Sequence, residues 1–528
     1  MIAGLDKAWR APPDSSSLLW VIRRLIADRP HARARGAEQS AGQPTSLRLT
    51  IGIGATHPAR SSRVAAPDPA SRQQCRSEHR LLVTQGALLT VRSAGAQLTR
   101  RLVYRTGCMD LHPHTSPAPI DFFDQDTNDC PYHAYETLRS QQPAWRDPRT
   151  GMIVITRYDD VREVLLDTET FSSGSHRGRV DPRSAKIKAM YEAKGWVPGR
   201  TLAARDDPEH RQMRALFNHA FRPAKIKELD PFIVELADRL IDDFIGAGEC
   251  DIVRAFAIPL PLIVIGRQMG ANEADIWQIK AWTDAWVQRL GMMQTDDEMT
   301  WSTEQEIEAQ HYFQRIFERL RAQADDSLLS DLVRTEIPEW GRTLTDNELH
   351  AEMMADTFVG GSETTTNALS AGVRLLIENP AAWMQVKNDP DTYVPRLVEE
   401  VLRLESPVQG LFRSTTRDVD LHGVTIPKGA VINVRFAAAN RDDRQFGCPA
   451  DMDLDRGNVR SHIAFGFGVH HCLGAPLARR ELIIGFNAIV RRIDRMWFVD
   501  GRNDFRHQPN FVLRSLRELH IGFEPSAA

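Results

Sequence analysis

The sequence predicts a mainly α-helical protein with a small β-rich lobe. Two segments carry long helical patterns: apolar residues recur at helical spacing through 226–245, and a second pattern spans 345–378. Strand signals are fewer and shorter. Residues 151–158 form one run rich in β-branched side chains, and 419–434 read as a β-hairpin region with glycines between apolar segments. Helices therefore dominate the predicted architecture.

The composition is that of an ordinary globular protein and excludes several classes of function. Hydrophobic residues make up 42% of the 528 residues and charged residues 26%, and the formal net charge of −4 excludes a strongly basic nucleic-acid binder. No stretch reaches the roughly 18 uninterrupted apolar residues that a membrane span requires. The first residues also lack the charged-then-apolar layout of a secretion signal. We therefore expect a soluble, cytoplasmic protein without a membrane anchor.

Residues 1–108 differ in composition from the rest of the chain. They are rich in Arg, Ala, Ser and Pro and hold 17 Lys and Arg against 6 Asp and Glu, without a sustained hydrophobic period. We expect a disordered N-terminal extension here and one domain over 109–528. Three origins of the extension remain open: an organelle transit peptide, a functional disordered arm, or an upstream extension of the reading frame. We favour the third, with Met109 as the true start.

The stretch 465–474 reads FGFGVHHCLG and is the most informative motif of the chain. Its two central glycines permit tight turns and the close approach of a flat partner. A helical pattern follows, so Cys472 is expected at a helix N-terminus, where the dipole and free N–H groups favour a thiolate. Such a thiolate suits an axial iron ligand. From these residues alone, a buried structural cysteine, a zinc ligand and a Cys–His nucleophile also remain open.

The segment 207–217 carries a pair of candidate anion-binding residues. His210 and Arg214 lie four residues apart on a predicted helix and hence on one face. This is either a solvated basic face or a pair that binds an anion, because imidazole and guanidinium groups both donate to a carboxylate.

The segment just upstream, 171–202, is irregular and rich in Ser, Gly and Arg. Because long loops in compact enzymes are usually functional, we assign it to the substrate mouth.

The helix predicted at 345–378 has an unusual centre. It opens with a capping box at Thr345 and contains the run VGGSETTT at 359–366. Two adjacent glycines cost about 1 kcal/mol each relative to alanine. A helix with such a weak centre is expected to open locally, and close packing against another helix is the alternative explanation for the glycines.

The full pattern F-G-x-G-x-H-x-C-x-G closely resembles the heme-binding loop of the cytochrome P-450 family, the heme-thiolate monooxygenases. The resemblance implies the cytochrome P-450 fold in a single heme domain, with Cys472 as the iron ligand of heme b. It also implies four residues that bind the heme propionates, namely His210, Arg214, Arg413 and His470. Five further residues are implied to lie against the heme, namely Phe465, Gly466, Gly474, Gly360 and Gly361.

The long helix is similar to the family's oxygen-handling helix. On that resemblance Thr364 hydrogen-bonds dioxygen and Glu363 passes protons, since a hydroxyl beside a carboxylate delivers protons without admitting free water. Many relatives carry Asp at the second position, so the longer Glu363 leaves the geometry of proton transfer open. The predicted substrate pocket is apolar and is lined by Val359, Val408, Leu411, Phe511 and Val512.

Two groups of charged residues complete what the resemblance implies. Glu400 and Arg403, in an E-x-x-R pattern, are expected to form a buried structural ion pair, which Arg441 or Arg456 completes; we favour Arg456. Arg479 and Arg480, just after the cysteine, are expected to contribute to a basic face for an acidic electron donor.

The implied reaction is the activation of O2 to hydroxylate or epoxidise a small apolar substrate, either a terpenoid, a steroid, a fatty acid or an aromatic molecule. The chain shows neither a glycine-rich dinucleotide fingerprint nor a reductase domain. Electrons are therefore expected from a separate ferredoxin and its flavin-dependent reductase. Two alternatives remain, namely a peroxygenase or dehydratase of the same fold, and a non-catalytic heme-binding sensor.

Overall fold

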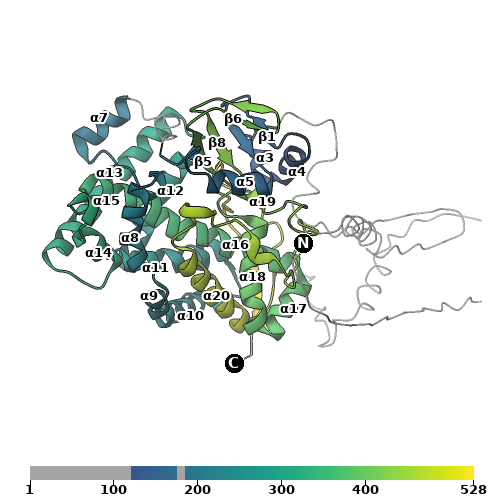
Figure 1. Ribbon diagram of the computed structural model, residues 1–528. Coiled ribbons are helices and arrows are strands. Elements are labelled where there is room, and N and C mark those ends of the chain that lie inside the picture. Colours follow the sequence, from purple (N-terminus) through teal and green to yellow (C-terminus); the bar gives the residue numbers. More distant parts are fainter. Residues whose placement is uncertain (1–119, 175–184, 528) are drawn as a thin grey trace, which may run out of the picture. The chain divides into compact units, whose positions relative to one another are not determined.

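Helices form most of the structure and the strands gather in small sheets, as a computed structural model shows for residues 120–174 and 185–527 (Figure 1). The predicted fold class, mainly α with a small β-rich lobe, is confirmed. The predicted N-terminal extension, 1–108, and the start at Met109 lie outside the described residues. Within the described ranges, no helix combines the length and apolar character needed to cross a membrane.

The helices that precede the central run include the helical segments predicted at 207–217 and 226–245. They are α3 (Gln125–Asp129), α4 (Tyr132–Gln141), α5 (Tyr158–Leu166), α7 (Ala185–Lys194), α8 (Glu209–Ala220), α9 (Pro223–Glu228), α10 (Asp230–Ile245), α11 (Pro259–Gln268), α12 (Ile276–Leu290), α13 (Asp296–Ala322) and α14 (Leu328–Arg334). Short 3-10 or π segments lie between them, namely η2 (Leu202–Ala204), η3 (Val253–Ala257), η4 (Glu273–Asp275) and η5 (Pro338–Trp340).

The helix expected over 345–378 is three segments in one continuous run. They are α15 (Asp346–Ala351), the π-helix η6 (Glu352–Glu363) and α16 (Thr364–Glu378). The predicted capping box is present, because Thr345 accepts from the Glu348 N–H and the Glu348 side chain reaches back to the cap. The remaining helical elements are α17 (Pro380–Asn388), α18 (Pro390–Glu405), α19 (Phe436–Ala439), η7 (Val459–Ser461), η8 (Gly468–His470) and α20 (Ala475–Arg492).

A five-stranded sheet joins segments from the two ends of the described chain. Its order is β1-β2-β8-β5-β3, with the central pair β2–β8 parallel and its other pairs antiparallel. Its strands are β1 (Ala144–Arg146), β2 (Ile153–Ile155), β3 (Phe171–Ser172), β5 (Leu411–Thr415) and β8 (Val431–Val434). The predicted hairpin is the pair β6 (Val419–Leu421) and β7 (Val424–Ile426), while β4 (Glu249–Asp251), β9 (Ile493–Phe498) and β10 (His520–Pro525) form a third sheet.

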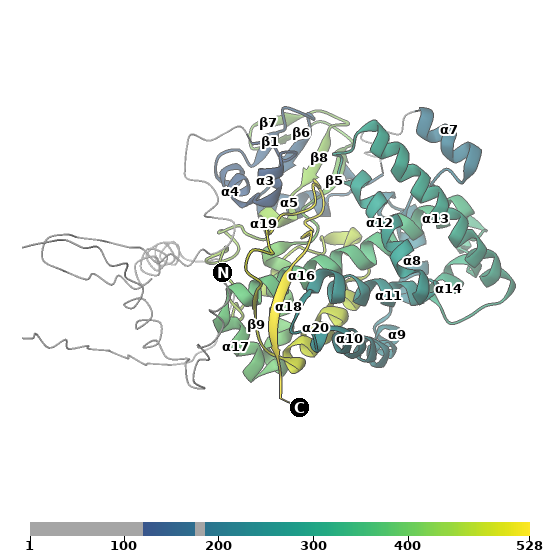
Figure 2. The ribbon, with the colours of Figure 1, turned by 180° about the vertical axis from the view of Figure 1, so that it is seen from behind.

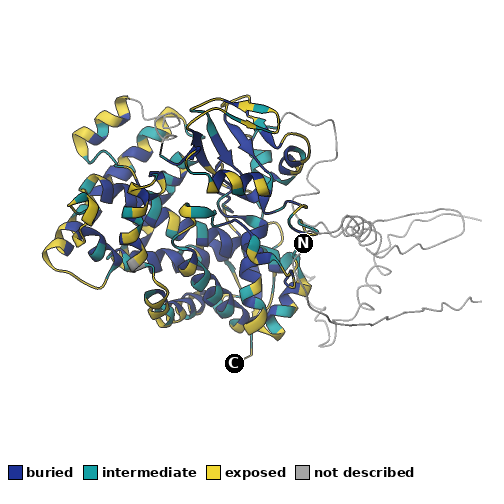
Figure 3. Cartoon of the chain, viewed as in Figure 1, coloured by how far each residue is buried: buried dark blue, intermediate teal, exposed yellow. Residues whose placement is uncertain are grey.

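The largest apolar cluster lies among the helices and surrounds the central run. It takes buried side chains from α10, α11, α16, α18 and α20. Seen from both sides, α16 lies between α11 and α18, with α20 beside it (Figures 1 and 2). Figure 3 shows the buried residues along these inner elements and the exposed residues on outer ones such as α7. The helix that follows Gly360 and Gly361 and the helix that follows Cys472 thus share one core.

One segment expected to be irregular contains regular structure. The predicted loop 171–202 begins with β3 and includes α7. Among the residues of α7 only Ile187 and Tyr191 are buried, so the helix presents almost no apolar stripe from which a helical period could be predicted.

Candidate active site

The loop 465–474 is a tight turn that ends where α20 begins. Gly466 and Gly468 have φ angles of +71° and +72°, which glycine adopts without strain. A side chain at Gly468 would lie 2.7 Å from the Leu165 carbonyl oxygen, so α5 leaves room only for glycine. The Cys472 N–H donates to the Phe465 carbonyl at 2.9 Å and closes the turn. The predicted turn, and the predicted place of Cys472 just before a helix, are confirmed.

Burial and the predicted helix N-terminus act on the pKa of Cys472 in opposite directions. Crowding by protein atoms raises the pKa of Cys472, and the N–H groups of Gly474 and Ala475 offset this only in part. The thiol is nevertheless solvent-accessible. A bound metal ion deprotonates a coordinating thiol outright, so the protein environment need not do so in advance.

Four predicted propionate ligands form a cluster in which two buried donor atoms lack acceptors. The rings of His210 and His470 lie 4.1 Å apart, and the charges of Arg413 and Arg214 both act on His470. His210 Nε2 and Arg413 Nε are buried and have no hydrogen-bond partner. Burial lowers the pKa of Arg413 to about 10, and the charge of Asp206 offsets this only partly.

This cluster fits a group that brings its own carboxylates. Buried, unpaired donors cost roughly 1–3 kcal/mol each, and two propionates of a heme would supply the missing acceptors. Arg214 also donates to the His471 carbonyl at 2.7 Å. It therefore links α8 to the loop that carries Cys472, which places the donors and the sulfur beside the same space.

The two adjacent glycines of η6 have different surroundings. A side chain at Gly361 would lie 3.0 Å from Ile265 Cγ1 on α11, so this glycine allows close helix packing. A side chain at Gly360 would meet nothing within 4 Å. Thr364 Oγ1 donates to the Gly360 carbonyl at 2.9 Å. The open space expected beside the weak centre therefore lies at Gly360, and the packing alternative holds for Gly361.

Glu363 is held by residues of α12 that sequence reasoning missed. Its carboxylate accepts from Thr283 Oγ1 at 3.0 Å and pairs with Lys280 Nζ at 3.1 Å. Asp284 contacts the same ammonium group. Burial disfavours the charged form of Lys280, but the two carboxylates outweigh it and raise its pKa. No local pattern marks Lys280 or Thr283, because their partner lies about 80 residues further along the chain.

Four of the five predicted pocket residues belong to one apolar cluster. Phe511, Val512 and Val359 are buried in it, and Val408 packs against it. Leu411 is absent from this cluster and is 37% exposed. The Phe511 ring stacks on Phe123 at 5.0 Å between centroids and lies 6.0 Å from Phe412. The structure thus brings Val359, Val408, Phe511 and Val512 together and leaves Leu411 outside.

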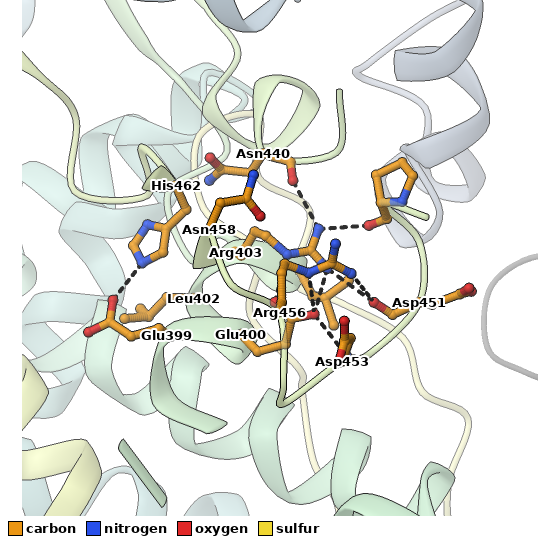
Figure 4. Close-up of polar contacts among 12 residues, drawn as sticks. Glu399, Glu400, Leu402, Arg403, Asn440, Asp451, Asp453, Arg456, Asn458 and His462 are labelled. Atoms are coloured by element: carbon orange, nitrogen blue, oxygen red, sulfur yellow. Dashed lines mark hydrogen bonds and ion pairs between the residues drawn. The ribbon is translucent and has the colours of Figure 1, made fainter. Parts of the chain in front are cut away.

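The E-x-x-R residues form a buried ion network (Figure 4). Arg403 and Glu400 are fully buried and make two hydrogen bonds, at 2.7 and 2.8 Å. Arg456 Nε donates to Glu400 at 3.1 Å, as we favoured, while Arg441 lies 3.7 Å from Glu405 instead. Arg403 also donates to backbone carbonyls at 440, 449 and 451. The network therefore fixes α18 to the chain that leads into the 465–474 loop.

Replacing Glu400 with glutamine is expected to lower the free energy of unfolding by about 3–5 kcal/mol, because two buried guanidinium groups lose their shared carboxylate. Urea unfolding measures the change. A matched control is Asp455→Asn, which removes the exposed ion pair with Arg396 and should cost no more than about 1 kcal/mol. Equal effects of the two substitutions would contradict a structural role for the buried network.

Arg479 and Arg480 each pair with an acidic residue of the protein. Arg479 Nε donates to Glu399 at 2.7 Å, and Arg480 is paired with Asp230 at 2.6 Å. Both side chains nevertheless stay partly exposed. Their contribution to a basic face for an acidic electron donor stays a prediction.

Comparison with known proteins finds relatives that match most of this chain. The family model described as cytochrome P-450 matches residues 279–517. The chain is 31% identical to a steroid C26-monooxygenase of Mycobacterium tuberculosis over 393 residues, which are 74% of this chain and 94% of the relative. It is 32% identical to the polyketide biosynthesis cytochrome P-450 PksS of Bacillus subtilis over 418 residues, 78% of this chain and 98% of that one.

A solved structure shares the fold over most of the chain. It is the cytochrome P-450 BioI in complex with an acyl carrier protein ligated to hexadec-9Z-enoic acid, with a TM-score of 0.68 and 27% sequence identity. The match covers 76% of this chain and 99% of the other.

Proposed function

We propose that this chain, which belongs to the cytochrome P-450 family and is a heme b monooxygenase, inserts one oxygen atom of O2 into a small apolar substrate with electrons from a separate ferredoxin. Heme supplies the redox-active iron at which O2 is activated. The observation that carries the proposal is the four-donor cluster, which the contact of Arg214 with the His471 carbonyl joins to the loop of Cys472.

The donor cluster and Cys472 hold the cofactor from two sides. Arg413, Arg214, His210 and His470 would bind its carboxylates, and this is supported by the unpaired Nε2 of His210 and the unpaired Nε of Arg413. Cys472 would supply the axial sulfur from the turn that Gly466 and Phe465 shape, and Gly474 keeps the helix start close to that sulfur.

Thr364 and Glu363 would hold and move the protons that the reaction consumes. The Thr364 hydroxyl now donates to the Gly360 carbonyl, so it must turn to donate to dioxygen at the open side of Gly360. Glu363 is buried, and its contacts run to Lys280 and Thr283. Because Lys280 also contacts the partly exposed Asp284, this chain of polar groups would connect Glu363 to the outside of α12.

An apolar substrate is supported by the cluster that contains Phe511, Val359 and Val408. Relatives named for steroid and polyketide chemistry agree with a terpenoid, steroid, fatty-acid or aromatic substrate. Leu411, which stands apart from the cluster, remains a candidate at its edge. We also propose a cytoplasmic location and a flavin-dependent reductase for the ferredoxin. Arg479 and Arg480, which pair with Glu399 and Asp230 but stay partly exposed, would contribute to the docking face for the ferredoxin.

The test is turnover of the purified holoprotein with NADPH, a surrogate ferredoxin and its reductase. We expect an oxygenated product only when O2 and the full electron chain are present, with substrates chosen by screening a ligand library for a low-spin to high-spin shift. Product formed only with peroxide would favour a peroxygenase instead. A protein that binds heme but yields no product with any reductant or peroxide would favour a sensor.

A further inference from the structure

Arg435 is a buried cation whose charge the protein leaves uncompensated. It follows β8 directly and is 2% exposed. Its guanidinium carbon lies 4.1 Å from the centre of the Phe511 ring, 4.8 Å from Phe122 and 5.7 Å from Tyr135. NH1 donates to the Phe511 carbonyl at 2.7 Å, and Nε is buried without a partner. Among the described residues, no carboxylate forms an ion pair with this side chain.

Such an arrangement is costly for a protein on its own. An arginine stays charged at any physiological pH, and a buried charge needs both an opposite charge and hydrogen-bond partners. Two other deeply buried arginines have them, since Arg403 pairs with Glu400 and Arg514 with Glu405. The rings around Arg435 recover part of the cost through cation–π attraction, but they accept no hydrogen bond from Nε.

The surroundings of Arg435 are those of the proposed substrate pocket. The Phe511 ring and carbonyl that it contacts lie in the same apolar cluster as Val512, Val359 and Val408. A side chain at Gly410 would lie 3.1 Å from Arg435 Cδ, so the segment between Val408 and β5 passes directly over the arginine. The guanidinium group therefore lies beside residues that are predicted to line the pocket.

We propose that Arg435 binds the carboxylate of the substrate, so that this enzyme acts on apolar organic acids. This rests on the proposed function and narrows its substrate class. A guanidinium in an aromatic cage matches a molecule with an apolar body and one acidic end, because the rings contact the body and the free N–H groups take the oxygens. Heme propionates are the other source of a carboxylate, but Arg413, Arg214, His210 and His470 already provide donors for both.

The test compares acids with alcohols of the same carbon skeleton. Wild-type holoprotein is titrated with dodecanoic acid and dodecan-1-ol, and with 4-ethylbenzoic acid and 4-ethylbenzyl alcohol, and the heme spin-state shift gives each dissociation constant. We expect at least one acid to bind about 10- to 100-fold more tightly than its alcohol. Arg435→Gln should remove that preference while alcohol binding stays within about twofold, and Arg435→Lys should restore part of it.

A matched control is Arg139→Gln. Arg139 is also buried and donates to the Ala438 carbonyl, but it does not contact Phe511, so its loss should leave the acid preference unchanged. Wild-type protein that binds neither acid better than its alcohol would overturn the proposal, and this outcome needs no variant to fold. Loss of heme from Arg435→Gln with no change in the ratio of acid to alcohol affinity would also overturn it, and would assign Arg435 to the cofactor.

Failure of the proposed function is a separate observation. The binding titrations need no electrons, whereas the monooxygenase reaction does. Acid-selective binding without NADPH-driven product would leave the Arg435 site intact and remove the monooxygenase reaction. Efficient oxygenation of neutral substrates with no preference for acids would support the monooxygenase reaction and overturn the Arg435 site.

Discussion

Replacing Cys472 with serine is expected to abolish monooxygenase turnover and to remove the thiolate signature from the carbon-monoxide difference spectrum of the reduced protein. A serine hydroxyl keeps the shape of the turn but loses the soft, electron-rich sulfur that favours cleavage of the O–O bond. The loop itself should survive, because its conformation depends on the positive φ angles of Gly466 and Gly468 and on the Cys472 N–H. The variant should therefore fold and lose activity.

The control for this experiment is Cys250→Ser. Cys250 is the other free cysteine among the described residues, and burial raises its pKa to about 12, so it is an inert thiol. Its substitution should leave both the spectrum and the turnover unchanged. An unaltered carbon-monoxide spectrum in Cys472→Ser would contradict the assignment of Cys472 as the heme ligand, whatever the effect on activity.

Replacing Thr364 with alanine is expected to separate electron consumption from product formation. NADPH oxidation should continue while the yield of product per NADPH falls by about 10²-fold, because a positioned hydroxyl contributes on this scale to proton transfer. Glu363→Gln should slow turnover by a similar factor and should increase the solvent deuterium isotope effect. The measurements are NADPH consumption, product and released hydrogen peroxide on the same sample.

Thr366→Ala separates this role from simple helix stability. Thr366 lies on the same helix, but its hydroxyl donates to the Ala257 carbonyl at 2.9 Å and holds η3 in place. Its loss should cost about 1 kcal/mol of folding free energy and leave the yield per NADPH intact. Equal uncoupling in the Thr364 and Thr366 variants would contradict a proton-delivering role for Thr364. Thr364→Ser should restore most of the yield.

Features of the site that depend on neighbouring residues could be predicted from the sequence. Glycine positions in the 465–474 loop, the helix after Cys472 and the capping box at Thr345 all depend on residues within a few positions of one another. Local rules also predicted that the helix would open near Gly360. They did not predict that the π-helix begins at Glu352, well before the glycines.

Two carboxylates near the start of the π-helix contact a segment far away in the sequence. The Glu352 carboxylate accepts from the Leu202 N–H, and the Asp356 carboxylate accepts from the Ala203 N–H at 3.1 Å. These contacts cross about 150 residues of sequence, and only the folded chain reveals them. The contact of Lys280 with Glu363 likewise joins residues far apart in the sequence, so only the folded chain reveals it.

Charge on the surface was the least predictable part of the site. Arg479 and Arg480 occur in a basic run, yet each meets an acid from a distant helix, Glu399 on α18 and Asp230 on α10. A count of charges along the sequence cannot distinguish a free guanidinium from a paired one. Arg435, in contrast, has no acidic partner in the part of the chain that the structure describes. No motif in the sequence marks it, and only the aromatic rings that enclose it in the structure show that its charge is buried.

The parallel pairing of β2 with β8 has a consequence for folding during synthesis, because β2 is made long before the strand that pairs with it. Ile153 faces Ile432, so during synthesis β2 leaves the ribosome about 280 residues before its neighbour exists. Until then the hairpin of β1 and β2 presents an open, entirely apolar edge, which invites association with other nascent chains. Because Cys472 and α20 emerge later still, neither the cofactor site nor the helical core is complete until the last part of the chain has been synthesised. Slow translation or scarce chaperones should therefore reduce the yield of folded chain even when heme is abundant.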